Sequence, residues 1–144
     1  MTGYVARTEK HVAAPPERVW EVLTSTDPHP ELMFGARTVT DWTVGGPVRW
    51  EGEWQGRSFT DSGEVLAFEP GRLLRMTHWS PLSGAPDTPE NRHTLEYTLR
   101  AADDGTQVVL TQDNNATAEE AEHSASNWST MLDGLRMLAE RDAA

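Results

Sequence analysis

The last apolar segment of this chain, from Thr117 to Ala139, constrains the fold more than any other part of the sequence. Its apolar residues recur at alternating intervals of four and three positions, which places them along one face of an α-helix. They are Ala121, Ala125, Trp128, Leu132, Leu135 and Ala139. Thr117 and Glu120 form a T-x-x-E capping box, which predicts where the helix begins. A terminal helix this long must cover something, and we expect it to pack on a sheet formed by the preceding strands.

Strand-like segments with alternating apolar and polar residues occupy most of the remaining sequence. A first strand is expected from Tyr4 to Ala13, and the prolines and glutamate at 14–17 then open a short helix. Residues 31–34 form at most a second short helix. Six further strands are expected, separated by turns or, at 80–90, by an exposed loop. Their expected ranges are 38–44, 48–54, 59–68, 73–79, 93–99 and 108–112.

This order of elements predicts an α+β fold built as one domain over residues 1–144. Strands joined by short turns pair antiparallel, and an antiparallel sheet with one wet face needs helices only on the other face. A chain of 144 residues is also long enough to bury a core of its own.

Composition excludes several classes of function. The chain has no cysteine, so disulfides, thiolate nucleophiles and cysteine-ligated metals are impossible. Its formal net charge of −11 repels nucleic acid and anionic membranes. The first ten residues lack the apolar run of a signal peptide, and no segment reaches the roughly 18 consecutive apolar residues of a membrane span. We therefore expect a soluble cytoplasmic protein with neither a nucleic-acid nor a membrane partner.

Motifs for metal, phosphate or nucleophilic chemistry are also missing from the sequence. No two of the five histidines have the spacing of a metal-binding motif, and neither a P-loop nor G-x-G-x-x-G occurs. The nucleophile motif G-x-S-x-G is absent as well. These observations predict no metal and no cofactor, and they favour a binding protein over an enzyme without deciding between them.

Several segments, in this order, resemble the START-like (SRPBCC) superfamily, and within it the branch of heat-shock-protein ATPase activator homologues. The matching segments are APPERVWEVLT at 14–24, GGPVRW at 45–50, GEVLAFEP at 63–70, GTQVVLT at 105–111 and Asn127-Trp128 with Leu132 and Leu135. The resemblance covers about residues 5–138. It implies a helix-grip fold, in which a curved antiparallel sheet wraps around the long C-terminal helix, with one or two short helices after the first strand.

The sequence departs from the family's usual pattern in three places. A tryptophan-rich segment often follows the second helix, where this chain has Leu32-Met33-Phe34-Gly35. A histidine often ends the last strand, where Gln112 stands here, and the residue before the helical tryptophan is Asn127 rather than glycine. These changes alter the pocket rather than the fold.

The resemblance implies a cavity between sheet and helix, and the six tryptophans suggest that aromatic rings line it. The alternative is that Trp42, Trp50, Trp54 and Trp128 simply fill the core. Gly52, on the same face as Trp50, leaves space for a ligand or for close approach of the helix. We expect an apolar wall with two polar anchors, His78 and Gln112. The expected wall residues are Trp50, Trp54, Met76, Tyr97, Trp128 and Leu132.

Titratable groups on these strands leave two interpretations open. His78 shares a strand face with Leu74 and Met76, so it either points into the cavity or lies satisfied at its rim. Asp61 would be a candidate acid or base if it were desolvated, but we expect it to lie solvated beyond the core edge. Gln112 either anchors a ligand or bonds to the backbone.

The function predicted on these grounds is sequestration or sensing of a small hydrophobic or aromatic molecule, with a homodimer as a possible assembly. Two alternatives follow from the resemblance. One is an enzyme, because relatives include polyketide cyclases, aromatases and hydrolytic resistance proteins. The other is a chaperone-interaction module that uses the acidic face containing Glu119, Glu120 and Glu122.

Overall fold

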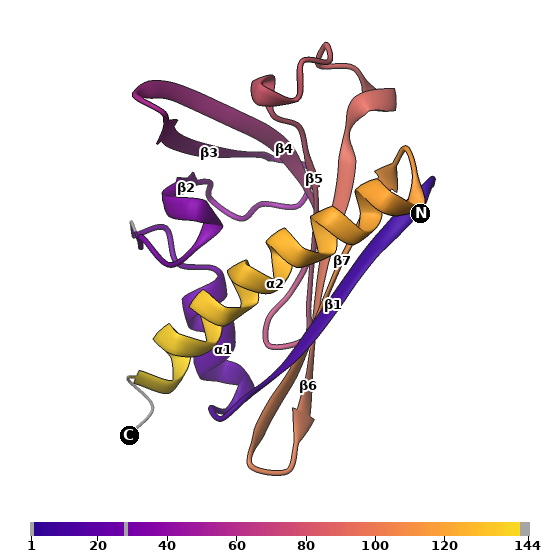
Figure 1. The fold of residues 1–144 in the computed structure, drawn as a ribbon. Coiled ribbons are helices and arrows are strands. Elements are labelled where there is room, and N and C mark those ends of the chain that lie inside the picture. The colour runs from indigo at the N-terminus through magenta and orange to yellow at the C-terminus, as the bar shows by residue number, and fades with distance from the viewer. Residues whose placement is uncertain (1, 28, 142–144) are drawn as a thin grey trace.

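The protein folds into one curved antiparallel sheet gripping a long C-terminal helix (Figure 1), as seen in a computed structural model that describes residues 2–27 and 29–141. The strands are β1 (Tyr4–Val12), β2 (Arg37–Val39), β3 (Pro47–Trp54), β4 (Arg57–Glu69), β5 (Leu73–His78), β6 (His93–Ala102) and β7 (Gly105–Asn115). The helices are α1 (Pro16–Leu23) and α2 (Ala118–Arg141), with short 3₁₀ turns η1 (Met33–Gly35), η2 (Pro81–Ser83) and η3 (Pro89–Asn91). The predicted α+β helix-grip fold is confirmed.

The sheet has the order β1-β7-β6-β5-β4-β3-β2. Strands that follow one another in the sequence are therefore adjacent in the sheet, except for β1 and β2. The first strand pairs instead with the last strand, in a register that places Thr8 opposite Leu110 and Lys10 opposite Val108. Helix α2 crosses the face formed by these strands, and α1 lies beside it (Figure 1).

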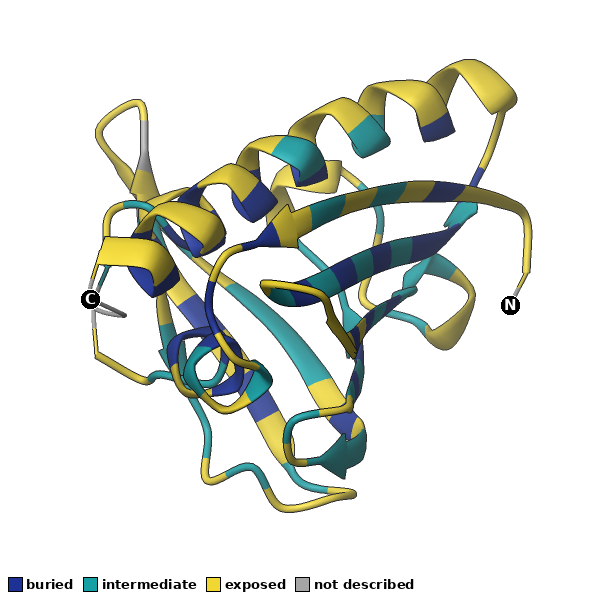
Figure 2. Ribbon diagram, turned by 90° about the horizontal axis from the view of Figure 1, so that it is seen from below, coloured by how far each residue is buried: buried dark blue, intermediate teal, exposed yellow. Residues whose placement is uncertain are grey.

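Alternation along the strands places one face of the sheet in the core. On β6, Leu95 and Tyr97 are fully buried, and on β7 Leu110 is fully buried too. Their neighbours along the strands are more exposed, which gives the striped pattern in Figure 2. The stripe on α2 closes this core through Leu132 and Leu135. The helix therefore buries the face that the periodicity predicted.

The capping box marks the start of α2 as predicted, with one change of partner. The Thr117 Oγ1 accepts a hydrogen bond from the Glu120 N–H at 3.0 Å. The Glu120 carboxylate accepts from the N–H of Ala116, at 2.8 Å, rather than from that of Thr117.

Further along the helix, the position of Gly134 requires glycine, because the backbone carbonyl oxygen of Glu31 occupies the space that a Cβ would need. The chain before η1 therefore lies directly on the helix.

Strand β4 belongs to two parts of the sheet and bends between them. Residues 57–64 pair with β3, and residues 65–69 pair with β5. At the bend, Ser62 and Trp79 exchange backbone hydrogen bonds of 2.9 and 2.8 Å. A Cβ on Gly63 would overlap the backbone oxygen of Thr77, so the close approach requires glycine. The bend lets the β3–β4 hairpin project past the rest of the sheet (Figure 1).

Strand β2 is shorter than the predicted strand at 38–44. The Thr40 Oγ1 accepts from the Trp42 N–H, and Asp41 Oδ1 accepts from the Thr43 N–H, both at 3.0 Å. These bonds make a turn in which Trp42 has a φ of 59°. The Trp42 ring stacks on Phe68 at 5.5 Å. Trp42 therefore packs against the hydrophobic core, as the core-filling alternative expects.

Candidate ligand pocket

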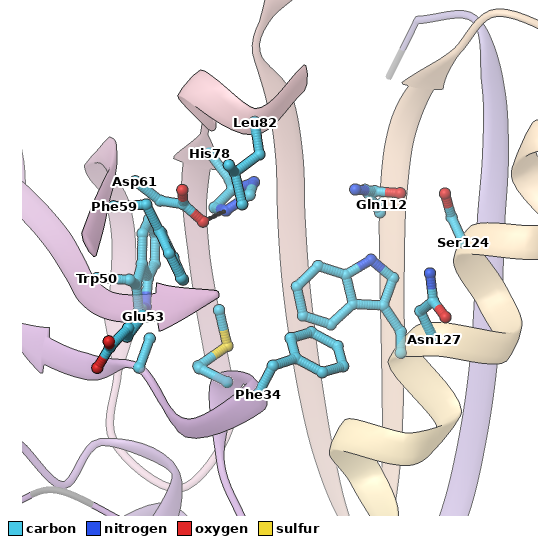
Figure 3. A pocket seen from close by; sticks show the side chains of 13 residues that line it. Phe34, Trp50, Glu53, Phe59, Asp61, His78, Leu82, Gln112, Ser124 and Asn127 are labelled. Atoms are coloured by element: carbon cyan, nitrogen blue, oxygen red, sulfur yellow. Dashed lines mark hydrogen bonds and ion pairs between the residues drawn. The ribbon is translucent and has the colours of Figure 1, made fainter. Parts of the chain in front are cut away.

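A pocket of about 410 Å³ lies between strands β3–β5 and the first half of α2, with η1 at its edge (Figure 3). Four aromatic side chains line it: Phe34, Trp50, Phe59 and Trp128. The volume falls in the range of about 300–1,000 Å³ that is usual for small-molecule sites, which are mostly apolar with a few polar groups. The space between sheet and helix is thus not completely filled.

The aromatic rings come from different elements and have different exposures. Trp50, on β3, is 1% exposed, and its ring centroid lies 5.0 Å from that of His78. Phe34, in η1, is 57% exposed and packs 5.7 Å from Trp128 of α2. Met33 and Phe34 both have positive φ angles, of 47° and 56°. Such left-handed conformations are uncommon for large side chains, so the surrounding contacts hold this edge of the pocket in place.

Gly52 creates space for a ring of the protein itself. A Cβ at this position would lie 2.7 Å from the Phe59 Cζ and 3.2 Å from the Ala36 Cβ. Gly52 and Phe59 are direct partners across the β3–β4 ladder. We had predicted that Gly52 leaves space for a ligand or for the helix. The space is instead occupied by the Phe59 ring, which forms part of the pocket wall.

Asp61 and His78 form a hydrogen-bonded pair in the pocket wall (Figure 3). The His78 Nε2 lies 3.0 Å from Asp61 Oδ2, and the two side chains are 13% and 14% exposed. Asp61 stands opposite Trp50 in the ladder, and the bend of β4 brings it to the end of β5. The expectation that Asp61 is solvated beyond the core edge was wrong, because it did not anticipate this bend.

Three buried polar atoms of the pocket residues have no hydrogen-bond partner among the described residues. They are Asp61 Oδ1, His78 Nδ1 and Gln112 Oε1. An unsatisfied buried polar group costs roughly 1–3 kcal/mol of stability. Such groups are rare in native proteins, and each one calls for a structural or functional reason. Here all three belong to side chains that line one cavity.

The predicted site residues divide between this pocket and the core. Trp50, His78, Gln112 and Trp128 line the pocket. Three others pack in the hydrophobic core and do not line it: Met76, Tyr97 and Leu132. Burial raises the pKa of the Tyr97 phenol. The backbone of Trp54 ends β3, but its side chain lies outside the part of the chain that the structure describes.

A family model described as "Activator of Hsp90 ATPase homolog 1-like protein" matches residues 13–140. The chain belongs to this family. A solution structure of the protein ChR145 from Cytophaga hutchinsonii is 42% identical, with a TM-score of 0.82, and the match covers 98% of this chain and 97% of that one. None of the curated proteins compared matches the chain.

Two solved structures with lower sequence identity share the fold of this chain. The solution structure of the Aha1 dimer from Colwellia psychrerythraea is 19% identical, with a TM-score of 0.71 over 95% of this chain and 96% of that one. DynU16, a putative protein of the dynemicin biosynthetic locus, is 20% identical, with a TM-score of 0.74 over 96% of this chain and 48% of that one. At these identities the likeness extends to the fold alone.

The three departures from the family pattern all map to the pocket of this family member. Phe34, Gln112 and Asn127 line it, from η1, β7 and α2 respectively. The sequence analysis had predicted that these departures alter the pocket rather than the fold, and at least one residue of each lies in the pocket lining. Phe59, Leu82 and Ser124 were missed, and the pattern of the sequence contained no signal that would have assigned them to one site.

No helix within the described ranges is long and apolar enough to cross a membrane. Across the same residues, no three histidine, aspartate or glutamate side chains gather closely enough to hold a metal ion. The pocket lining offers an aromatic surface, a histidine–aspartate pair, the side-chain amides of Gln112 and Asn127, the Ser124 hydroxyl and the Glu53 carboxylate.

Proposed function

We propose that this family member binds a small hydrophobic or aromatic molecule in the pocket between its sheet and α2, for sequestration or sensing. The observation that supports this is a cavity of about 410 Å³ whose wall combines four aromatic rings with partly satisfied polar groups. A cavity that served packing alone would not need polar side chains at its lining. Aromatic walls with a few polar groups are typical of small-molecule sites.

The apolar surface is sufficient for useful affinity. Burying roughly 300 Å² of apolar ligand surface at about 25 cal/mol per Å² contributes about 7–8 kcal/mol. This gain alone corresponds to a dissociation constant of a few micromolar, and because association also costs translational and rotational freedom, that value is the upper limit of the affinity that apolar burial provides without polar contacts. Trp50, His78, Gln112 and Trp128 are the proposed contacts that the sequence had already indicated.

Native mass spectrometry of the freshly purified protein, paired with a denatured sample, tests this function first. A bound mass that is released on denaturation would identify a ligand and support the proposal. A protein that carries no such mass, and that also binds none of a set of aromatic compounds, would contradict it.

A filled-pocket variant shows whether the ligand occupies this cavity. Asn127 lines the pocket and is exposed, so Asn127→Trp places a large ring into the cavity with little effect on the core. Ser126→Trp, at the neighbouring exposed position outside the pocket lining, is the matched control. We expect Asn127→Trp to lose the bound mass and Ser126→Trp to keep it. Equal retention by both variants would place the ligand elsewhere.

The Asp61–His78 pair favours an enzyme as the second candidate. When the Asp61 carboxylate accepts a hydrogen bond from Nε2–H of His78, the other ring nitrogen, Nδ1, carries a lone pair. A lone pair in this position can remove a proton from a bound substrate. On this alternative, His78→Gln abolishes turnover of the identified ligand while the circular dichroism of the protein is unchanged. Ligand that is recovered chemically unaltered after long incubation would contradict it.

A homodimer and a cytoplasmic location also remain proposals. Support for the dimer comes from the dimeric Aha1 relative of Colwellia psychrerythraea, whose fold this chain shares. Light scattering of the purified protein over a range of concentrations measures the assembly directly. A constant mass of about 16 kDa at every concentration would contradict the dimer.

A further inference from the structure

The charges at the pocket have a single sign. Asp61 lines the wall and Glu53 lies at the rim, where it is exposed. Within residues 2–27 and 29–141, no lysine or arginine is among the pocket-lining residues. The formal net charge of the whole chain is also negative, at −11. An anionic ligand would therefore enter a negative potential without meeting a cationic side chain, whereas a cation would be attracted.

The aromatic faces favour the same sign of charge. Trp50 and Trp128 both lie against His78, with ring centroids 5.0 and 6.4 Å from the imidazole. The faces of such rings carry negative quadrupole potential and attract ammonium groups, tryptophan most strongly. Phe34 and Phe59 add two further rings to the same cavity. Aromatic rings next to a carboxylate are a typical site for an organic cation.

The hydrogen-bonding state of the pair adds a third, independent contribution. An ionised carboxylate only accepts hydrogen bonds, so in the neutral form of His78 that donates Nε2–H to Asp61, the other ring nitrogen, Nδ1, keeps a lone pair. Neither this lone pair nor Asp61 Oδ1 has a donor among the described residues. In a low-dielectric interior their potential is poorly screened and acts on whatever occupies the pocket.

We propose that the pocket is selective for an organic cation, namely an ammonium group carried by a hydrophobic or aromatic body, and discriminates against carboxylates. This inference rests on the proposed ligand-binding function and specifies the chemical class of its ligand. The apolar body packs on the aromatic wall, and the ammonium group lies at the end of the pocket that holds Asp61 and His78.

Three probes that share one aromatic body test the charge preference. They are 2-naphthylmethylamine, 2-naphthalenemethanol and 2-naphthoate, which at pH 8 present a cation, a neutral hydroxyl and an anion. Dissociation constants are measured by titration of ¹⁵N-labelled protein, and the indole N–H signals of Trp50 and Trp128 report binding in the pocket. We expect the amine to bind at least about tenfold more tightly than the carboxylate, with the alcohol between them.

A carboxylate variant and a charge-matched control show the source of the preference. Asp61→Asn removes the pocket charge, and we expect the ratio of amine to alcohol affinity to fall toward one. Asp104→Asn makes the same change of charge in the distant β6–β7 turn, where φ is 63° and asparagine is well tolerated. It should leave that ratio unchanged. If Asp61→Asn fails to fold, Glu53→Gln provides the second measurement, because it removes the exposed carboxylate at the rim and should lower the same ratio.

The outcomes separate this inference from the proposed function. Binding of all three probes with equal affinity, or tighter binding of the carboxylate, would overturn the charge preference and leave the pocket as a ligand site. If none of the probes shifts the indole signals, both the preference and the proposed function are contradicted. A ratio that changes equally in Asp61→Asn and Asp104→Asn would assign the preference to net charge rather than to the pocket and would overturn it.

Discussion

The two ends of the interface between sheet and helix are built from the same inward-facing pattern but are packed differently. At the filled end, Leu74, Tyr97 and Leu110 form one row across β5, β6 and β7, and each is fully buried in the core. The next row toward the pocket contains Met76, Leu95 and Gln112. Gln112 already lines the cavity, and one row further on is His78.

This difference shows that stability and recognition are assigned to different ends of one core. The filled end consists of apolar side chains in close contact. Burial and close packing of such side chains provide most of the stability of a fold. The pocket end holds unsatisfied polar atoms and left-handed residues, both of which cost stability. Residues whose retention is costly for folding are candidates for function. The following predictions test this division, starting with the largest effect.

Removing apolar volume at the filled end should have the largest effect. Leu135 is fully buried, and Leu135→Ala is expected to lower the free energy of unfolding by about 2–5 kcal/mol, measured by urea denaturation. Met137→Ala, at a position that is 49% exposed, should change it by less than about 0.5 kcal/mol. Probe affinity of the folded Leu135→Ala protein should be unchanged. A loss of affinity would show that the two ends are not separable.

Alkaline pH should destabilise the filled end through Tyr97. Burial raises the pKa of its phenol, so above about pH 10 the unfolded chain releases a proton that the folded chain retains. The stabilisation is complete below pH 10 and falls as the pH rises further, by up to about 1.4 kcal/mol per pH unit. Tyr97→Phe should show a shallower slope in urea denaturation between pH 9 and 11, and the exposed Tyr4→Phe should not. Identical slopes for Tyr97→Phe and the parent would refute this explanation.

Substitutions at two buried polar residues of β7 should change the stability of the protein in opposite directions. We expect these two changes to be the smallest of the predicted effects. Gln112→Leu removes an unsatisfied amide oxygen at the pocket end and should raise stability by about 1 kcal/mol. Thr106 donates from Oγ1 to the carbonyl of Ala14 at 2.8 Å, so Thr106→Val should lower stability by about 1 kcal/mol. Thermal denaturation of both variants measures these two changes in stability. If both variants lose stability, the Gln112 amide contributes to folding and the contrast between the ends fails at this position.

The sequence predicted the filled end better than the pocket end, for a physical reason. The stripe containing Leu132 and Leu135, and the alternation containing Tyr97, are local patterns that identify an inward face. Whether an inward side chain fills a core or lines a cavity depends on the separation of sheet and helix. Periodicity contains no information about that separation, so Met76, Tyr97 and Leu132 were assigned to the wall although they pack in the core.

The pocket chemistry was hidden by long-range geometry. Asp61 was expected in solvent because the bend of β4 depends on the contact between Gly63 and the Thr77 backbone, which no local pattern reveals. Phe34 reaches Trp128 through two successive residues with positive φ. His78 and Gln112 were identified because a polar residue in line with apolar ones on a strand is a local anomaly, and such anomalies are what sequence analysis detects well.

The pairing of β1 with β7 also determines when this protein can fold during synthesis. β1 is made before the other strands, yet its ladder partner is β7. Ala13, the residue after β1, donates its N–H to Glu140 near the end of α2 at 2.8 Å. Closing so long a loop is entropically costly and slow. On the ribosome β1 therefore remains without its native partner until β7 has emerged. In nascent chains stalled before β7, we expect β1 to be cleaved by protease.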